Sequence, residues 1–370
     1  MTFHRSLLTA AAAVVLMAAA APAVAYTVQG APAAAATSAP TIDRSVKVAP
    51  GGVYEIVFNP ADKTVLVAAV GPRGENRAAI ARLDATTLAP GASIDVSSDA
   101  LYGLGFNSRT QTLYGTATRT GTVAAIDVRT NRVIATIKDG DDDSAHVREA
   151  IVDEVNNKVY VTIVGGDAGD ASRPNQVWVI DGATNKLERK LDVTVGSLTG
   201  AAIDNTHNRL YVVGMGSNTV GVVDLATGAT TATYPTGSDR ATNVAVDEAG
   251  NRLFIASQGS GDLTVLNANT GEIIRKVPTG EGALSVAYNP TNGQIYVSNR
   301  QAGTVTVVSG ADYSVLANLA TGTFPQTIAI DRATNTVYVT NKARGLPRDA
   351  PAGTPVPVDP NGDTVTIIRP

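Results

Sequence analysis

The chain has 370 residues, a formal net charge of −4 and no cysteine. The lack of cysteine excludes disulfides, thiol nucleophiles and cysteine-bound metals, so packing alone must hold the fold together. The mildly acidic balance also argues against a dedicated nucleic-acid-binding domain, because such domains are usually basic.

The first residues are typical of an export signal. Residues 1–5 form a short basic head, residues 7–21 are an unbroken run of small and apolar residues, and Ala23 and Ala25 fit a cleavage site. We therefore predict a signal peptide over residues 1–25, cleaved after Ala25, and a protein secreted to the periplasm or the extracellular space. Residues 26–41 are rich in Ala and Pro and predict a flexible tether. The rest of the chain, 42–370, contains no apolar run long enough to span a membrane.

A repeat organises residues 42–370. Short apolar runs that break into polar turns recur, as in "QIYVSNR" (294–300) and "TVYVTNK" (336–342). An Asn or Asp stands seven residues before the central position of each copy, and most copies are followed by a second Asp or Asn turn. These central positions, called anchors below, are 42–51 residues apart and are Leu66, Tyr114, Tyr160, Tyr211, Phe254, Tyr296 and Tyr338.

Each period therefore predicts four short strands joined by three turns, with almost no helical periodicity. Four strands in about 40–45 residues is the pattern of one β-propeller blade. We predict an all-β, seven-bladed β-propeller with four antiparallel strands per blade over residues 42–370. The last period lacks a fourth strand, and the isolated strand at 43–48, "DRSVKV", is predicted to supply it and to close the ring.

The repeated units resemble a known family. The "YVTN", "YVSN" and "YVTI" units, the "VWVIDG" of the third period and the stretch "YVSNRQAGTVTVV" (296–308) are similar to those of the YVTN-repeat β-propellers. With its predicted signal peptide and its long insertion before the final strand, the chain resembles the exported, seven-bladed YncE-like type over residues 42–370. The resemblance implies an architecture and no single function, because propellers of this kind include binding proteins, surface proteins and a few enzymes.

One face of the predicted propeller carries all of the long insertions. The turns between the first and second strands are uniform, whereas the loops between the second and third strands are long at 70–77, 164–176 and 342–363. Variable loops on a rigid scaffold favour a functional face. The innermost strands begin on the same face, so we predict a ligand site at the channel mouth. Its candidate residues are Tyr54, Glu55, Tyr102, Arg119, His146, Arg148, Glu149, Arg240, Arg300 and Gln326. In an alternative interpretation, Arg148 pairs with Glu149 or Glu55 and merely closes the axis.

Little in the sequence points to catalysis. Of three histidines, His4 lies in the signal peptide and His207 is expected in a solvated turn. Only His146 lies on the proposed face, and one histidine cannot supply a His-rich metal site or, without obvious partners, a Ser-His-Asp triad. The acidic segments 139–143 and 359–363 offer oxygen ligands that suit Ca²⁺ but lack the EF-hand pattern, so we favour solvated loops. No cofactor, metal or catalytic residue is predicted.

We favour an exported, non-enzymatic binding or interaction propeller, a monomer, with an unknown ligand or cell-envelope partner. A second hypothesis is the binding of single-stranded DNA or another polyanion through the arginine-bearing loops of the same face, with bases stacked on Tyr54 and Tyr102. A third is a lactonase-like hydrolase that would use His146, Arg148 and the neighbouring glutamates.

Overall fold

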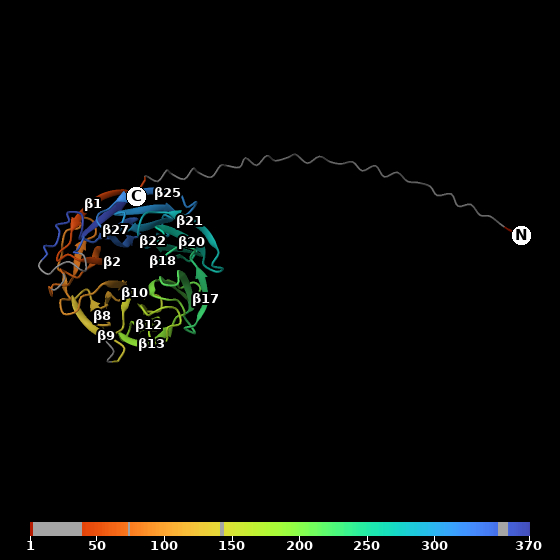
Figure 1. The fold of residues 1–370 in the computed structure, drawn as a ribbon, viewed down its shortest axis with the longest axis horizontal. Coiled ribbons are helices and arrows are strands. Elements are labelled where there is room, and N and C mark those ends of the chain that lie inside the picture. The colour runs from red at the N-terminus through yellow and green to blue at the C-terminus, as the bar shows by residue number, and fades with distance from the viewer. Residues whose placement is uncertain (3–38, 73–74, 141–143, 347–353) are drawn as a thin grey trace. The chain divides into compact units, whose positions relative to one another are not determined.

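The computed structural model describes residues 1–2, 39–72, 75–140, 144–346 and 354–370. Almost all of the predicted signal peptide, 1–25, and of the predicted tether, 26–41, lies outside these residues. Every element of the propeller is a β-strand, and the strands form seven four-stranded antiparallel sheets. The sheets stand side by side as the blades of a ring around a central channel (Figure 1). The predicted seven-bladed fold is therefore confirmed.

The strands of each blade are given below from the channel outwards. Blade 1 consists of β2 (Val53–Asn59), β3 (Thr64–Ala69), β4 (Ala79–Asp84) and the very short β5 (Ile94–Asp95), and blade 2 of β6 (Gly103–Asn107), β7 (Thr112–Ala117), β8 (Thr122–Asp127) and β9 (Arg132–Ile137). Blade 3 consists of β10 (Val147–Asp153), β11 (Lys158–Ile163), β12 (Gln176–Asp181) and β13 (Lys186–Asp192), and blade 4 of β14 (Leu198–Asp204), β15 (Arg209–Gly214), β16 (Thr219–Asp224) and β17 (Thr230–Pro235). Blade 5 consists of β18 (Ala241–Asp247), β19 (Arg252–Ser257), β20 (Asp262–Asn267) and β21 (Ile273–Pro278), and blade 6 of β22 (Ala283–Asn289), β23 (Gln294–Asn299), β24 (Thr304–Ser309) and β25 (Val315–Ala320). Blade 7 consists of β26 (Pro325–Asp331), β27 (Thr336–Asn341), β28 (Thr364–Arg369) and β1 (Thr41–Lys47).

Both ends of the propeller meet in blade 7. Its strand order is β26, β27, β28, β1, so the first strand of the propeller is added to the outside of its last sheet. Thr41 pairs with Arg369 and Lys47 with Thr364, and the Asp43 carboxylate accepts a hydrogen bond from the Arg369 guanidinium at 2.8 Å. The predicted closing strand is therefore present, and it completes the last blade of the ring.

The hydrophobic core lies between adjacent blades. One cluster, for example, joins Tyr296 and Val307 of blade 6 to Val339 and Ile368 of blade 7. Each fully buried side chain of this kind contributes roughly 1.5–3 kcal/mol of transfer free energy. The anchor tyrosines are among the largest fully buried side chains, and Tyr296 is only 1% exposed. The repeat therefore marks the side chains that pack one blade against the next.

Three of the five anchor tyrosines, Tyr114, Tyr211 and Tyr338, also bond to the following blade through their hydroxyl groups. The hydroxyl of Tyr338 donates to the carbonyl of Ala85 at 2.9 Å, and that of Tyr211 donates to the carbonyl of Ala268 at 3.3 Å. In each case the acceptor lies in the turn between the third and fourth strands of the next blade. The tyrosine is thus a blade-to-blade link rather than a ligand-binding group.

The hydroxyl residue two positions after an anchor forms a second link. Thr340 donates to the carbonyl of Tyr54 at 2.6 Å, Ser298 to that of Gln326 at 2.7 Å and Thr116 to that of Arg148 at 2.7 Å. The three acceptors are the second residues of the innermost strands of blades 1, 7 and 3. The "YVT" part of the repeat therefore positions the backbone of three predicted site residues.

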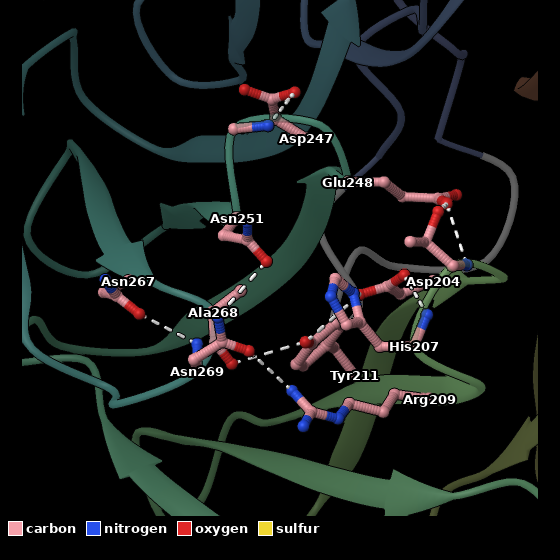
Figure 2. A network of polar contacts seen from close by, with 12 residues as sticks. Asp204, His207, Arg209, Tyr211, Asp247, Glu248, Asn251, Asn267, Ala268 and Asn269 are labelled. Carbon is pink, nitrogen blue, oxygen red and sulfur yellow. Dashed lines mark hydrogen bonds and ion pairs between the residues drawn. The ribbon is translucent and has the colours of Figure 1, made fainter.

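The face with the uniform turns is bound together by short polar contacts (Figure 2). The Nδ1 atom of His207 lies 2.8 Å from the Oδ2 atom of the buried Asp204, and Arg209 donates to the side chain of Asn269 at 3.0 Å. The Glu248 carboxylate reaches from blade 5 to the backbone and hydroxyl of Thr206 in blade 4. His207, which we expected to be solvated, has a side chain that is only 31% exposed because it caps this turn. These contacts leave little room for variation on this face.

Candidate functional site

A cavity of about 540 Å³ lies at the channel mouth, on the face that carries the long loops. It is lined by the first residues of the innermost strands and by residues that directly follow second strands, from six of the seven blades. Nine of the ten predicted residues line it, namely Tyr54, Glu55, Tyr102, Arg119, His146, Arg148, Glu149, Arg300 and Gln326.

Arg240 is the predicted residue that does not line the cavity. It directly precedes β18, its φ is 52°, and it is exposed. The residue fourteen positions before the anchor has a positive φ in five blades, where it is Gly52, Ser197, Arg240, Gly282 or Phe324. Arg240 therefore occupies a left-handed turn position that feeds the strand, two residues before the position that reaches the channel.

The sequence prediction missed a second ring of cavity residues. Thr118, Gln258 and Lys342 line the cavity, and each stands four residues after an anchor, as does the predicted Arg300. The prediction counted residues back from the anchors along the innermost strands. Counting forward along the second strands, which end at the same face, would have found these side chains as well.

Two tyrosines and two cations form one side of the mouth. The rings of Tyr54 and Tyr102 meet edge to face, with centroids 4.9 Å apart and an interplanar angle of 75°. The Nζ atom of Lys342 lies 3.7 Å from the centroid of the Tyr54 ring and bonds to its hydroxyl. The guanidinium of Arg119 lies 5.7 Å from the centroid of Tyr102. Cations over aromatic faces are attracted by the ring quadrupole, so these contacts orient Lys342 and Arg119 at the mouth.

Phe324 organises the adjoining part of the mouth, in blade 7 beside Tyr54 and Lys342. Its ring lies between two guanidinium groups, with Arg300 at 4.6 Å and Arg344 at 5.2 Å from the centroid. Its carbonyl accepts hydrogen bonds from the side chain of Gln326 at 2.8 Å and from the backbone of Lys342 at 3.1 Å. Phe324 has a φ of 43°, which is rare for a bulky residue and costs backbone energy. Phe324 thus contacts three cavity residues, Arg300, Gln326 and Lys342, while its own backbone is strained.

The floor of the cavity contains two carboxyl groups and an arginine. Burial, reinforced by the like charge of Glu149, raises the pKa of Glu55 to about 8, although a hydrogen bond from Thr327 acts in the opposite direction. Burial likewise raises the pKa of Glu149 to about 7, and Arg148 and the amide of Asn243 oppose the shift. The two carboxyl groups therefore share about one proton near neutral pH.

Arg148 is not neutralised by either glutamate. In the part of the chain that the structure describes, its guanidinium forms no ion pair within 4.0 Å and no hydrogen bond, although both glutamates influence its charge through space. Its side chain is exposed to the cavity. The direct ion pair that the alternative interpretation expected between Arg148 and Glu149 or Glu55 is therefore absent from the described residues, although both carboxyl groups attract the guanidinium through space.

His146 lies at the edge of this cluster. Burial, followed by the positive charges of Arg148 and Arg173, lowers the pKa of His146, so its imidazole is neutral at pH 7. Within the described residues, no carboxylate contacts this imidazole to orient it. A neutral histidine without an orienting partner is poorly placed for a catalytic triad.

The long loops lie on the predicted face, but most of their residues do not reach the cavity. Among the described residues of the three insertions, Lys342 alone lines it. In blade 7 the acidic segment 359–363 holds the insertion in place: Asp359 accepts from Thr323 and Arg344, and Asp363 accepts from the backbone amides of Val53 and Ala343. These carboxylates are engaged in hydrogen bonds rather than arranged around an ion. Among the described residues no group of three or more potential metal ligands occurs, and most of the acidic segment 139–143 lies outside them.

The fold and the cavity define a seven-bladed propeller with a polar, arginine-rich channel mouth. No family model matches the chain. The chain is 28% identical over 167 residues to the protein YncE of Escherichia coli O157:H7 and of Escherichia coli strain K12, and 29% identical to that of Salmonella typhi. These matches cover 43% of this chain and 45% of the relatives, so the chain spans less than half the length of the curated relatives it matches. Together with the seven-bladed fold, they support a YncE-like propeller. In the described residues no helix is long and apolar enough to cross a membrane.

Proposed function

We propose that the protein is an exported, non-enzymatic binding propeller whose channel-mouth cavity holds a small organic anion. The observation that carries the proposal is the unpartnered guanidinium of Arg148, which faces the cavity beside two carboxyl groups that share about one proton. A cation without a carboxylate partner is available to a ligand, and carboxylates are the groups that arginine binds best.

The charge balance of the cavity supports an anion. Four basic side chains line it, namely Arg119, Arg148, Arg300 and Lys342. Because the glutamates are partly protonated, they cancel fewer than two of these charges. The cavity therefore carries a net positive charge, although the formal net charge of the whole chain is −4. A positively charged cavity attracts anions.

The size and lining favour a small molecule. A cavity of about 540 Å³ falls within the range of ordinary small-ligand sites. Gln258, Ser285 and Asn243 add uncharged polar groups to the lining, which would fix a ligand that also carries hydroxyl groups. Tyr54 and Tyr102 pack against each other and against Lys342 and Arg119, so their rings are not free platforms for stacked bases.

Calorimetry with defined probes tests the proposal. We expect gluconate, citrate or benzoate to bind, whereas sorbitol and benzamide, the neutral analogues of two of these anions, should not. A double variant with Arg148→Ala and Tyr54→Ala should lose binding at least tenfold while its Tm falls by no more than about 4 °C, because Arg148 faces the cavity and Tyr54 is only partly buried against the core cluster of blades 1 and 2.

Three results would contradict the proposal. If none of the anions bind at about 10 mM, the cavity is not an anion site. If they bind the double variant as well as the wild type, they bind elsewhere. If single-stranded oligothymidylate binds with steep salt dependence and displaces them, the polyanion hypothesis is preferred.

A further inference from the structure

We infer that the cavity takes up a proton when it binds an organic anion, so that its affinity for the anion falls as the pH rises above neutrality. The inference rests on the proposed function, because it concerns how the same cavity is regulated. It follows from the placement of two carboxyl groups beneath a ring of cations.

The two carboxyl groups come from equivalent positions of different blades. Glu55 and Glu149 each stand eleven residues before an anchor, in blades 1 and 3, and both line the cavity. In the described part of the chain neither forms an ion pair within 4.0 Å. Their hydrogen-bond partners are uncharged: Thr327 for Glu55, and for Glu149 the Asn243 amide, whose Nδ2 atom lies 3.4 Å from the carboxylate. Each carboxyl group is therefore free to gain or lose a proton without breaking a salt bridge.

An anion in this cavity must lie close to both groups. A volume of about 540 Å³ corresponds to a space roughly 8 Å across, so no point in it is far from the floor. A negative charge at about that distance raises the pKa of a carboxyl group by roughly 1–2 at protein-like dielectric constants. Since the pKa values without ligand are about 8 and about 7, the bound anion draws a proton onto the pair.

The other charged or titratable groups that line the cavity are four basic side chains, a histidine and tyrosines. The four basic side chains are Arg119, Arg148, Arg300 and Lys342. The pKa of His146 is lowered by burial and by nearby arginines, so its imidazole is already neutral, and burial raises the pKa of Tyr102 above its ordinary value of 10.0. Between about pH 7 and 9, the carboxyl pair is the group that responds.

The test is calorimetry of gluconate or benzoate binding at about pH 7.5 in two buffers with different ionisation enthalpies. We expect roughly half to one proton to be taken up per ligand, and an affinity that falls about three- to tenfold per pH unit between about pH 7 and 9. Both probes stay ionised throughout, so the proton must come to the protein.

Isosteric variants identify the acceptor. Glu55→Gln and Glu149→Gln should each reduce proton uptake, and the double variant should bind the anion with no pH dependence and more tightly than the wild type at about pH 9. Glu281→Gln is the matched control, because Glu281 is an exposed glutamate that does not line the cavity. It should leave proton uptake unchanged.

The outcomes separate this inference from the proposed function. If no probe anion binds the wild-type protein, both are overturned. If anions bind without proton uptake, or if the pH dependence persists in the double variant, the inference is wrong and the anion site stands. Whether the probe anions bind, and whether a proton is taken up with them, is measured on the wild-type protein alone, so these outcomes do not depend on the folding of a variant.

Discussion

The substitution Glu55→Gln should stabilise the protein at high pH and not at low pH. The pKa of Glu55 is raised from an ordinary 4.5 to about 8 in the folded protein, chiefly by burial. The folded state therefore holds a proton that the unfolded state has already lost between these two pH values. Stability contributed by that proton is complete below about pH 4.5 and is lost as the pH rises towards 8. Glutamine is neutral at every pH and avoids this loss.

The size of the effect follows from the same two values. A pKa difference of one is worth about 1.4 kcal/mol, so the full difference would approach 5 kcal/mol. The Glu55 side chain is partly exposed at the cavity, and Glu149 shares the proton, so we expect roughly 2–3 kcal/mol at about pH 9. At about pH 5 the difference between the two proteins should be below about 0.5 kcal/mol.

Urea unfolding followed by circular dichroism at the two pH values measures the difference. With an m-value of about 4 kcal/mol/M for a chain of this size, the midpoint of the variant should exceed that of the wild type by about 0.5 M at about pH 9. Glu281→Gln, with an exposed side chain, should shift neither midpoint. An equal shift at both pH values, or a variant less stable at high pH, would refute the reasoning that burial holds a proton on Glu55.

Two further substitutions and one calcium titration test contacts of blade 7. Tyr338→Phe removes the buried hydrogen bond to Ala85 and should lower the free energy of unfolding by about 1–2 kcal/mol. Tyr160→Phe is the control, because the Tyr160 hydroxyl bonds to no described residue, and it should lower the free energy of unfolding by less than about 0.5 kcal/mol. Urea unfolding compares the two variants, and equal losses would contradict the blade-to-blade link through Tyr338. Asp363→Ala leaves two backbone amides without their acceptor and should cost about 2 kcal/mol. Because these carboxylate oxygens are engaged in hydrogen bonds, adding calcium or a chelator should not change the Tm of the wild type, and a calcium-dependent Tm would show that the segment binds an ion.

The strand pattern was predictable because local chemistry repeats in every blade. The Asx residue seven positions before each anchor caps the turn that follows it, as Asn107 does for the backbone amides of Arg109 and Thr110. The alternation of buried residues then sets the register of each strand. Equivalent residues of different blades therefore reach the same end of the channel, which is why counting along the repeat found most of the cavity.

The remaining features depend on contacts that no local pattern encodes. Arg240 was assigned to the cavity because a left-handed residue before the strand was not foreseen, and nothing about Phe324 suggests that a phenylalanine would adopt a positive φ. The burial of Glu55 and Glu149 arises when blades 94 residues apart face each other across the channel. Their spacing along the chain says nothing about that distance, so their shared proton could not be predicted.

The pairing of Thr41 with Arg369 places the two ends of the propeller next to each other in adjacent antiparallel strands. A turn of a few residues between them would convert β28 and β1 into an ordinary hairpin. The chain could then be opened at another uniform turn, such as the one between Asp204 and Arg209, without removing a single strand. In such a circularly permuted protein the two termini would lie in blade 4, and the cavity would keep all of its lining strands. The channel mouth therefore does not depend on where the chain begins and ends within the ring.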